Sequence, residues 1–321
     1  MWDMRYDYPL DPELAAAAAL IPPVDLSDPA AARAAQAREV AERVAAVDGA
    51  GVAVGEVVAP GPRGAPDVPL RTYRPEGAAG PLPAVYSLHG GGFVVGSPDV
   101  DHAFNLWLCR RLDAVVVSPD YRLAPEHPFP AGLEDCYAGL CLLAEGDAGL
   151  DVAADRIAVL GDSSGAGMAT ALTMLARDRG GPGIRFQYLG SPALDDRVDT
   201  PSARAFTDTP VWTRHLARHT WEAYLGAGVA GGEGVSPYAA PARAGADGLR
   251  GLPPAYVAVM AYDPLRDEGV DYARALLAAG VATELHLFPG TFHGAAAVEY
   301  AGVVRRMRDE TVTVLRRALA R

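Results

Sequence analysis

Short apolar runs alternate with longer segments of helical spacing along most of this chain. The runs contain five to eight residues, are rich in Val, Ile, Leu and Ala, and end near polar, Gly or Pro residues. Runs of this length and composition are typical of strands. Strands are therefore predicted at residues 52–59, 68–74, 84–88, 114–118, 156–160, 184–189, 255–261 and 283–288.

The intervals between these runs have the composition and length of helices. Helices are predicted at residues 100–112, 131–144, 164–177, 267–279 and 296–320. Strands that alternate with helices along a chain form a mostly parallel sheet with helices on both faces. The pattern therefore predicts the α/β class.

Two segments do not follow this alternation. The first fifty residues are rich in Ala, with Ser27 as a candidate N-cap and Pro29 in the first turn of a helix that ends near Val47. Residues 195–252 separate two predicted strands, and an excursion of that length is typical of a lid or substrate domain. We expect residues 1–50 and 195–252 to form a helical cap, and residues 51–194 and 253–321 to form the catalytic core.

Charge and composition exclude several classes of function. The 28 basic residues against 40 acidic ones give a net charge of −12, which disfavours nucleic acid and anionic membrane surfaces as partners. The chain has no lysine, which excludes Schiff-base chemistry, a P-loop, a kinase strand lysine and a Ser-x-x-Lys dyad.

Neither the N-terminus nor any apolar stretch predicts membrane targeting. The apolar run 14–21 is short and lacks a basic start, and Pro and Gly residues interrupt the longest uncharged stretch, 77–98. The three cysteines form no Cys-x-x-Cys pair, so they indicate neither a disulfide framework nor a zinc site. We expect a cytoplasmic protein without a membrane segment.

The sequence Gly-Asp-Ser-Ser-Gly at 161–165 has the form G-x-S-x-G. It follows a predicted strand and precedes a predicted helix, which is the context that a nucleophile elbow requires. The turn raises Ser163 above the sheet, beside the positive end of the helix dipole. Ser163 is the candidate nucleophile.

The sequence His-Gly-Gly-Gly at 89–92 follows another predicted strand. Glycines expose the backbone, so their N–H groups can point at a substrate oxygen as an oxyanion hole requires. An ordinary glycine-rich turn is the alternative, but the G-x-S-x-G motif further along the chain makes it weaker.

A serine nucleophile needs a base and an acid that orients the base. Among seven histidines, His293 follows the last predicted strand, at the sheet edge where catalytic groups of open α/β sheets gather. His215 and His219 have the i,i+4 spacing of metal ligands, but a solvated helix face is the simpler interpretation because no H-E-x-x-H motif is present.

Asp263 follows the strand predicted at 255–261 and is the candidate acid. Asp267 and Glu268 come next and are interpreted as the N-cap and a first-turn residue of the following helix. The order Ser163, Asp263, His293 is that of α/β-hydrolases and differs from the orders in chymotrypsin-like and subtilisin-like proteases.

Taken together, the motifs resemble those of the bacterial hormone-sensitive-lipase-like carboxylesterases, from about residue 83 to the end of the chain. The matching segments are HGGG at 89–92, YRLAPEHPFPA at 121–131, GDSSG at 161–165, LPPAYV at 252–257, DPLRDEG at 263–269 and FHG at 292–294. The resemblance implies an α/β-hydrolase sheet with a helical cap and the triad Ser163, Asp263 and His293. It also implies oxyanion donors at the N–H groups of Gly91, Gly92 and Ser164.

By the same resemblance, the chain is expected to hydrolyse short-to-medium acyl esters through an acyl-enzyme and to need no cofactor. No Cys/His cluster has the spacing of a structural zinc site, so no metal is expected either. Three positions depart from the family pattern: Ser164 stands in place of Ala, Ser191 in place of Tyr, and Ala295 in place of a bulky residue. These departures indicate a reshaped pocket. Trp212, Trp221 and Tyr224 of the expected cap are candidate substrate-binding residues, with packing inside the cap as the alternative.

Other readings of the triad stay open at this stage. An amidase uses the same machinery, and a biosynthetic acyltransferase or lyase could reuse it. A non-catalytic small-molecule receptor is disfavoured because the histidine is present. A small-molecule ester is the expected partner, and a homodimer is left open.

Overall fold

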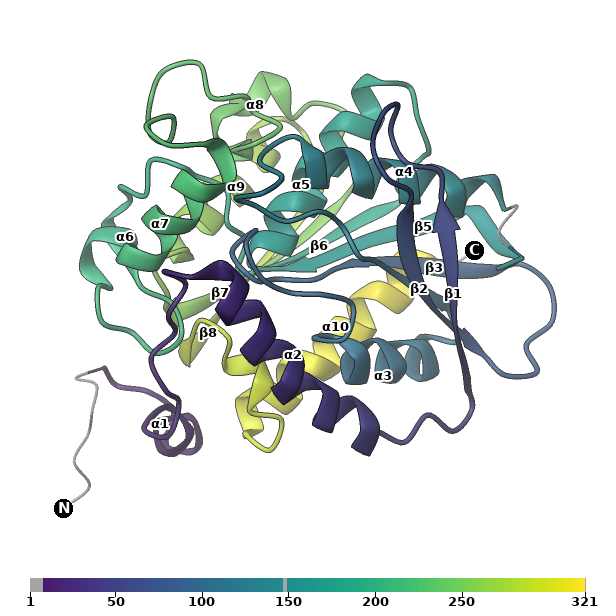
Figure 1. The fold of residues 1–321 in the computed structure, drawn as a ribbon, viewed down its shortest axis with the longest axis horizontal. Coiled ribbons are helices and arrows are strands. Elements are labelled where there is room, and N and C mark those ends of the chain that lie inside the picture. Colours follow the sequence, from purple (N-terminus) through teal and green to yellow (C-terminus); the bar gives the residue numbers. More distant parts are fainter. Residues whose placement is uncertain (1–7, 147–148, 321) are drawn as a thin grey trace.

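One eight-stranded sheet forms the centre of the computed structural model, which describes residues 8–146 and 149–320 (Figure 1). The strand order is β1-β2-β4-β3-β5-β6-β7-β8; β2 pairs antiparallel with β1 and β4, and all other pairs are parallel. The strands are β1 (Val52–Ala59), β2 (Val68–Pro75), β3 (Leu82–Leu88), β4 (Val115–Pro119), β5 (Val152–Asp162), β6 (Phe186–Gly190), β7 (Ala255–Tyr262) and β8 (Thr283–Phe292).

Helices cover both faces of this sheet (Figure 1). On one face α4 (Ala131–Glu145), α5 (Ser164–Asp178) and α9 (Arg266–Ala278) enclose the larger apolar cluster. On the other, α3 (His102–Leu112) and α10 (Gly302–Leu319) enclose a second cluster that includes Tyr188 and Tyr256. This arrangement confirms the predicted α/β-hydrolase fold.

Burial explains why the central strands appear as unbroken apolar runs in the sequence. All five residues of β4 and of β6 are buried, because these strands have a neighbour on each side and helices on both faces. Each fully buried Val, Leu or Phe contributes about 1.5–3 kcal/mol to folding. The edge strands β1 and β8 leave several side chains exposed.

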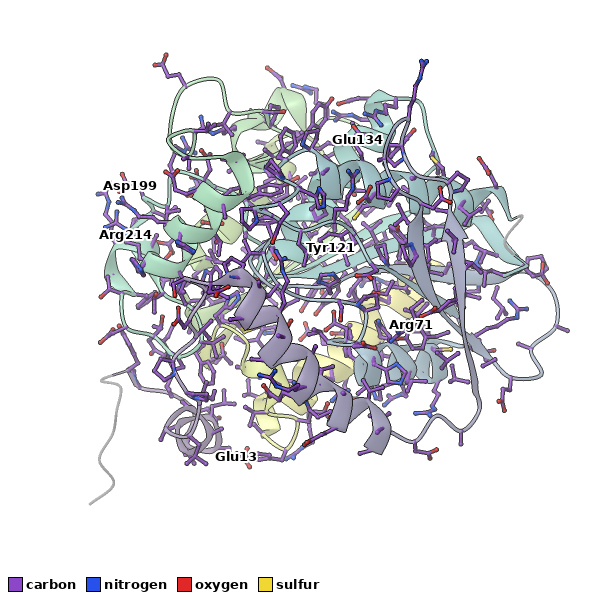
Figure 2. All side chains as sticks on the ribbon, viewed as in Figure 1. Glu13, Arg71, Tyr121, Glu134, Asp199 and Arg214 are labelled. Carbon is purple, nitrogen blue, oxygen red and sulfur yellow. The ribbon has the colours of Figure 1, made fainter. Side chains whose placement is uncertain are left out.

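The remaining helices lie outside these two layers. They are α1 (Pro12–Ala18), α2 (Pro29–Ala46), α6 (Pro201–Ala205), α7 (Arg214–Leu225), η1 (Pro241–Arg243), α8 (Gly245–Gly248) and η2 (Ala295–Ala297). Figure 2 shows Asp199 and Arg214 together at the outer border of the α6–α7 region, where Arg214 Nη2 donates to Asp199 Oδ1 at 3.1 Å. The first seven residues of the expected cap lie outside the described residues.

The N-terminal segment and the long insertion contact each other. Leu26 O lies 3.0 Å from His219 Nε2 of α7. Arg33 of α2 donates to Val94 O at 2.7 Å and to Ala124 O at 2.6 Å. The insertion itself divides, because η1 and α8 pack on α5 and α9 while α7 adjoins the loop that follows β3.

Several predicted boundaries were wrong by one turn or less, and three by more. β5 begins four residues before the predicted start, at Val152. The N-cap of α2 is Asp28, which accepts from Ala31 N at 3.0 Å, rather than Ser27. β8 continues four residues beyond the predicted end, to Phe292. The last helix begins at Gly302 instead of residue 296, after the short helix η2 (Ala295–Ala297).

Candidate active site

Ser163 stands in a sharp turn between β5 and α5. Its φ of 58° lies in the left-handed region, which a non-glycine residue rarely adopts and which is favoured here by the packing around the turn. A Cβ at Gly161 would lie 2.3 Å from the backbone of Gly165, and a Cβ at Gly165 would lie 2.1 Å from Leu88 O. The two glycines therefore permit the close packing that brings Ser163 beside the end of β3.

The three predicted triad side chains form one hydrogen-bonded line. His293 Nε2 lies 2.9 Å from Ser163 Oγ, and His293 Nδ1 lies 2.7 Å from Asp263 Oδ2. All three are buried, with exposed fractions of 6% for Ser163, 4% for His293 and 0% for Asp263. They come from the carboxyl ends of β5, β7 and β8, so residues separated by 130 positions meet at one edge of the sheet.

The charges around His293 favour its doubly protonated, positively charged form. Burial opposes the charged imidazolium, but the Asp263 carboxylate and its hydrogen bond outweigh burial and raise the pKa of His293. Asp162 adds a smaller effect in the same direction. The arrangement therefore stabilises the imidazolium that forms when His293 accepts a proton.

The glycine-rich loop after β3 lies against the elbow. A Cβ at Gly90 would lie 3.5 Å from Ser163 Cβ. The φ angles of Gly91 and Gly92, 130° and 59°, both lie in the region that favours glycine. Within the described residues, no hydrogen bond uses the N–H groups of Gly91, Gly92 or Ser164. Three free backbone donors thus remain in the two turns that meet at Ser163.

His89 and Tyr121 hold this loop in place. The Tyr121 hydroxyl donates to His89 O at 2.8 Å, and the two rings stack at 4.2 Å; Tyr121 lies near the middle of the molecule in Figure 2. His89 Nδ1 lies 2.9 Å from Gly90 O, and burial lowers the pKa of His89 to about 4. His89 is therefore neutral near pH 7 and supports the loop. Tyr121 stands in the motif at 121–131, but the sequence carries no signal for this contact.

The three aromatic residues predicted to bind substrate differ in their distance from Ser163, Asp263 and His293. The Trp212 ring lies 5.6 Å from the His293 ring, and a Cβ at Gly92 would lie 2.8 Å from Trp212 Cη2. Trp221 and Tyr224 instead pack on Phe93, at 5.1 and 4.0 Å between ring centres. Trp212 therefore adjoins the reacting groups, whereas the other two support the loop behind them.

Two further carboxyl groups near Ser163 have raised pKa values: Asp162, which precedes Ser163 in the chain, and Asp101, which Asp162 repels. Solvent reaches Asp162, yet the surrounding protein raises the pKa of its carboxyl to about 6. Burial, with repulsion from Asp162, raises the pKa of Asp101 to about 7. A Cβ at Gly190 would lie 2.5 Å from Asp162 Oδ1, so the glycine leaves room for this carboxylate. No motif in the sequence predicts this pair of carboxyl groups.

Asp267 is not the N-cap that the sequence predicted, whereas Glu268 is in the first turn of the helix as predicted. The helix α9 begins at Arg266, its N-cap position is Leu265, and both acidic residues lie in the first turn. Glu268 is buried and accepts from Leu194 N at 2.6 Å. Burial raises the pKa of Glu268 well above its usual value. Asp267 Oδ2 accepts from Ser202 N at 2.7 Å. Both carboxyl groups thus bind backbone of the insertion.

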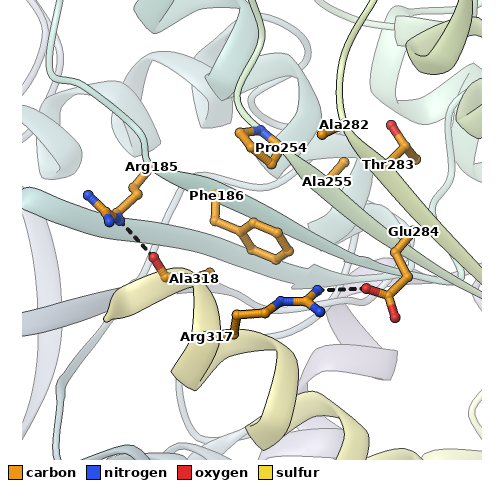
Figure 3. Close-up of a pocket in the computed structure, with 9 residues that line it drawn as sticks. All are labelled: Arg185, Phe186, Pro254, Ala255, Ala282, Thr283, Glu284, Arg317 and Ala318. Carbon is orange, nitrogen blue, oxygen red and sulfur yellow. Dashed lines mark hydrogen bonds and ion pairs between the residues drawn. The ribbon is translucent and has the colours of Figure 1, made fainter. Parts of the chain in front are cut away.

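A groove of about 520 Å³ lies at the opposite, amino edge of β6, β7 and β8. Figure 3 shows Phe186 between Arg185 and Arg317, with Arg317 paired to Glu284 at 2.7 Å. None of the triad or loop residues lines it. The groove is therefore separate from the site at the carboxyl edge.

Neither a metal cluster nor a membrane-spanning helix is found in the part of the chain that the structure describes. His215 is exposed on α7, and His219 binds the N-terminal segment through Leu26. The cytoplasmic location stays a prediction from the sequence. The homodimer, which the sequence left open, also stays open.

Comparison with known proteins places the chain in a family. A family model described as alpha/beta hydrolase fold matches residues 85–297. Carboxylesterase NlhH of Mycobacterium tuberculosis is 39% identical over 262 residues, which cover 80% of each chain. Esterase LipI of the same organism is 42% identical over 235 residues, covering 71% of this chain and 70% of LipI.

Solved structures agree with these relatives. The structure of a bacterial heroin esterase superimposes with a TM-score of 0.94 and 44% identity, covering 98% of this chain and 99% of that one. The fold, the family match and the relatives all lead to one assignment. The chain is an enzyme that belongs to the hormone-sensitive-lipase-like carboxylic ester hydrolases of the α/β-hydrolase fold.

Proposed function

We propose that the chain hydrolyses short-to-medium acyl esters through an acyl-enzyme formed on Ser163. The observation that carries this proposal is the line of contacts from Ser163 Oγ to His293 at 2.9 Å and from His293 to Asp263 at 2.7 Å. His293 takes the proton of Ser163, which attacks the ester carbonyl, and then gives that proton to the leaving alcohol. Water repeats the sequence on the acyl-enzyme.

The free N–H groups of Gly91, Gly92 and Ser164 are proposed as the oxyanion hole. They lie in the two turns that meet at Ser163, where negative charge develops on the carbonyl oxygen. Asp263 holds His293 in the tautomer that presents Nε2 to Ser163.

Residues 8–50 and 195–252 are proposed as the cap that selects the acyl group. Trp212 lies against both His293 and Gly92. We therefore propose that the acyl chain of an ester whose carbonyl oxygen is bound in the oxyanion hole contacts this ring. Trp221 and Tyr224 act through Phe93, behind the glycine loop. The cap supplies none of the triad side chains.

Trapping the intermediate tests this proposal. A p-nitrophenyl phosphonate should add one phosphonyl group to Ser163 and abolish hydrolysis of p-nitrophenyl butyrate, while Ser163→Ala should not be labelled. Peptide mass spectrometry locates the adduct. Dialysis against EDTA is the parallel control and should leave the rate unchanged. Labelling at another serine, or activity lost on chelation and restored by zinc, would refute the proposed mechanism.

A further inference from the structure

The N-terminus of α6 is bonded to the turn that follows Asp263. The Ser202 hydroxyl donates to Pro264 O at 2.9 Å, and Ser202 N donates to Asp267 Oδ2 at 2.7 Å. Asp267 N in turn donates to Ser202 Oγ at 3.0 Å. Ser202 is fully buried, so these three bonds form without competition from solvent.

The peptide unit between Pro264 and Leu265 connects this contact to the triad. Its carbonyl oxygen accepts the Ser202 hydroxyl, and its N–H donates to Asp263 Oδ1 at 2.9 Å. A trans peptide points its C=O and N–H in opposite directions, so a bond to the oxygen fixes the direction of the N–H. Hydrogen bonds at the two ends of one peptide also polarise each other.

A continuous chain of hydrogen bonds therefore runs from the insertion to the nucleophile. It passes from the Ser202 hydroxyl through the peptide 264–265 to Asp263 Oδ1, and from Asp263 Oδ2 through His293 to Ser163. Each of its polar side chains is buried. Asp263 has one oxygen for His293 and one for this peptide, so the peptide fixes the rotation of the carboxylate about its own axis.

The same helix turn holds the beginning of the insertion. Glu268, next to Asp267, accepts from the backbone N–H groups of Leu194 and Asp195 at 2.6 and 3.3 Å. The insertion is therefore bonded to the acid-bearing turn at two points, residues 194–195 and Ser202. A shift of the insertion would be transmitted to Asp263 through Ser202.

We propose that Ser202 is a positioning residue for the catalytic acid. It orients the Asp263 carboxylate through the peptide 264–265. Catalysis therefore depends on the position of α6 against the turn that follows Asp263. This inference rests on the proposed triad. Ser202 touches no reacting atom, so its loss should misplace Asp263 and His293 in the transition state while leaving substrate binding nearly unchanged.

Steady-state kinetics of Ser202→Ala test the proposal. We expect kcat for p-nitrophenyl butyrate to fall about tenfold, because small misplacements of catalytic groups cost up to about 10²-fold, while KM changes little. With weaker support from Asp263, the pKa of His293 should fall. The acid limb of kcat/KM should then move to lower pH by a few tenths of a unit, with Asp162 as the other charged group that acts on His293.

Ser236→Ala is the matched control, because Ser236 Oγ also accepts a backbone N–H within the insertion but does not contact the acid-bearing turn. Rates are normalised to reactive enzyme by titration with the phosphonate, so that misfolded protein does not count. Ser202→Cys, with a weaker donor of similar size, should fall between the wild type and Ser202→Ala.

Two results would overturn the role of Ser202 while leaving the proposed function intact. The first is a normalised kcat of Ser202→Ala within twofold of wild type. The second is a fall in kcat of Ser202→Ala that is no larger than that of Ser236→Ala, or that comes without any shift of the acid limb. If instead Ser163→Ala, assayed in parallel, keeps its activity, the proposed triad itself fails.

Discussion

The two edges of the sheet make opposite use of polar side chains. At the carboxyl edge, Ser163, His293 and Asp263 are buried and bonded to one another. At the amino edge, Arg185, Arg317 and Glu284 surround the groove of about 520 Å³ in Figure 3. The groove is open but its charged groups are exposed, whereas the carboxyl edge has the buried, mutually oriented groups that chemistry requires.

The two edges differ because water reaches the charged groups at the amino edge and is largely kept from those at the carboxyl edge. In Arg317 and Glu284, 67% and 46% of the side-chain surface is exposed, so water and salt screen their attraction. Around His293, little water competes, and the same kind of interaction is strong enough to raise its pKa. A site is therefore recognised by the burial and partners of its polar groups and not by the size of the hollow beside them.

The largest expected effect separates the two edges directly. Ser163→Ala should lower kcat by about 10⁴- to 10⁶-fold with the fold retained. Arg317→Ala at the amino edge should keep kcat within twofold and cost at most about 1 kcal/mol of unfolding free energy, as exposed ion pairs do. Ester hydrolysis and urea unfolding of both variants check this; activity of Ser163→Ala within tenfold of wild type would refute the nucleophile.

The next effect distinguishes two acidic residues within the carboxyl edge. Asp263→Asn should lower kcat about 10⁴-fold, because His293 would be held in the wrong tautomer. Asp267→Asn keeps an oxygen that can accept from Ser202 N and should cost far less. Initial rates from the two variants, with circular dichroism to confirm folding, test this order. Equal losses would mean that Asp263 is not the acid.

A smaller loss should come from closing the space at Gly92. The Cβ of Gly92→Ala would lie 2.8 Å from Trp212 and 2.9 Å from Thr220, which displaces the proposed oxyanion loop. We expect kcat to fall by about 10²- to 10³-fold, as after the loss of one oxyanion donor. Gly80→Ala is the control, since Gly80 has a similar positive φ of 74° and open space around it. A kcat of Gly92→Ala close to that of wild type would mean that the loop at Gly92 does not form the oxyanion hole.

Specificity should change less than rate. Trp212→Ala should raise kcat/KM for longer acyl chains relative to acetate by about tenfold, since a pocket discriminates by about 1–3 kcal/mol per methylene. Tyr224→Ala, on the far side of Phe93, should reduce thermal stability more than it alters this ratio. A series of p-nitrophenyl esters with melting temperatures measures both. An unchanged ratio in Trp212→Ala would remove that ring from the acyl pocket.

The smallest expected effect is one on stability. The pKa of Asp101 is raised to about 7, so folding takes up a proton and stability falls as pH rises from about 4 to about 7. Asp101→Asn removes that charge and keeps a good residue at the N-cap position of α3. Its melting temperature should exceed that of wild type by a few degrees at pH 8 and match it at pH 4. An equal difference at both pH values would contradict the raised pKa of Asp101, which burial and, to a lesser degree, repulsion from Asp162 produce.

Local motifs were enough to predict the centre of this molecule. Each residue of the proposed triad and each glycine of the loop after β3 has a recognisable neighbourhood of strand end, glycine and turn. The strand pattern likewise predicted all eight strands, because buried strands leave long apolar runs. The ends of elements were less predictable: Gly290 and Thr291 continue β8 because Thr291 is buried and bonded to Phe288 O, a contact without a sequence signal.

Contacts that involve residues outside the recognised motifs could not be predicted. Ser202 lies in an insertion without a motif, and its role depends on a turn more than sixty residues away. Asp267 was interpreted as a helix cap because acidic residues usually serve that purpose at a helix start. Its true partner, the backbone of Ser202, is set by how α6 packs on α9. Asp101 and Asp162 are likewise brought together only by the fold.

The position of α10 in the chain has a consequence for synthesis. Met307, Val314, Leu315 and Leu319 of this helix complete the apolar cluster that contains Tyr188 and Tyr256. Because α10 follows all eight strands, a ribosome that adds about 5–20 residues per second exposes an uncovered sheet face before the helix emerges. Such a face favours aggregation of nascent chains. The yield of active enzyme therefore depends on shielding that face, by slow expression or a chaperone, until the last helix arrives.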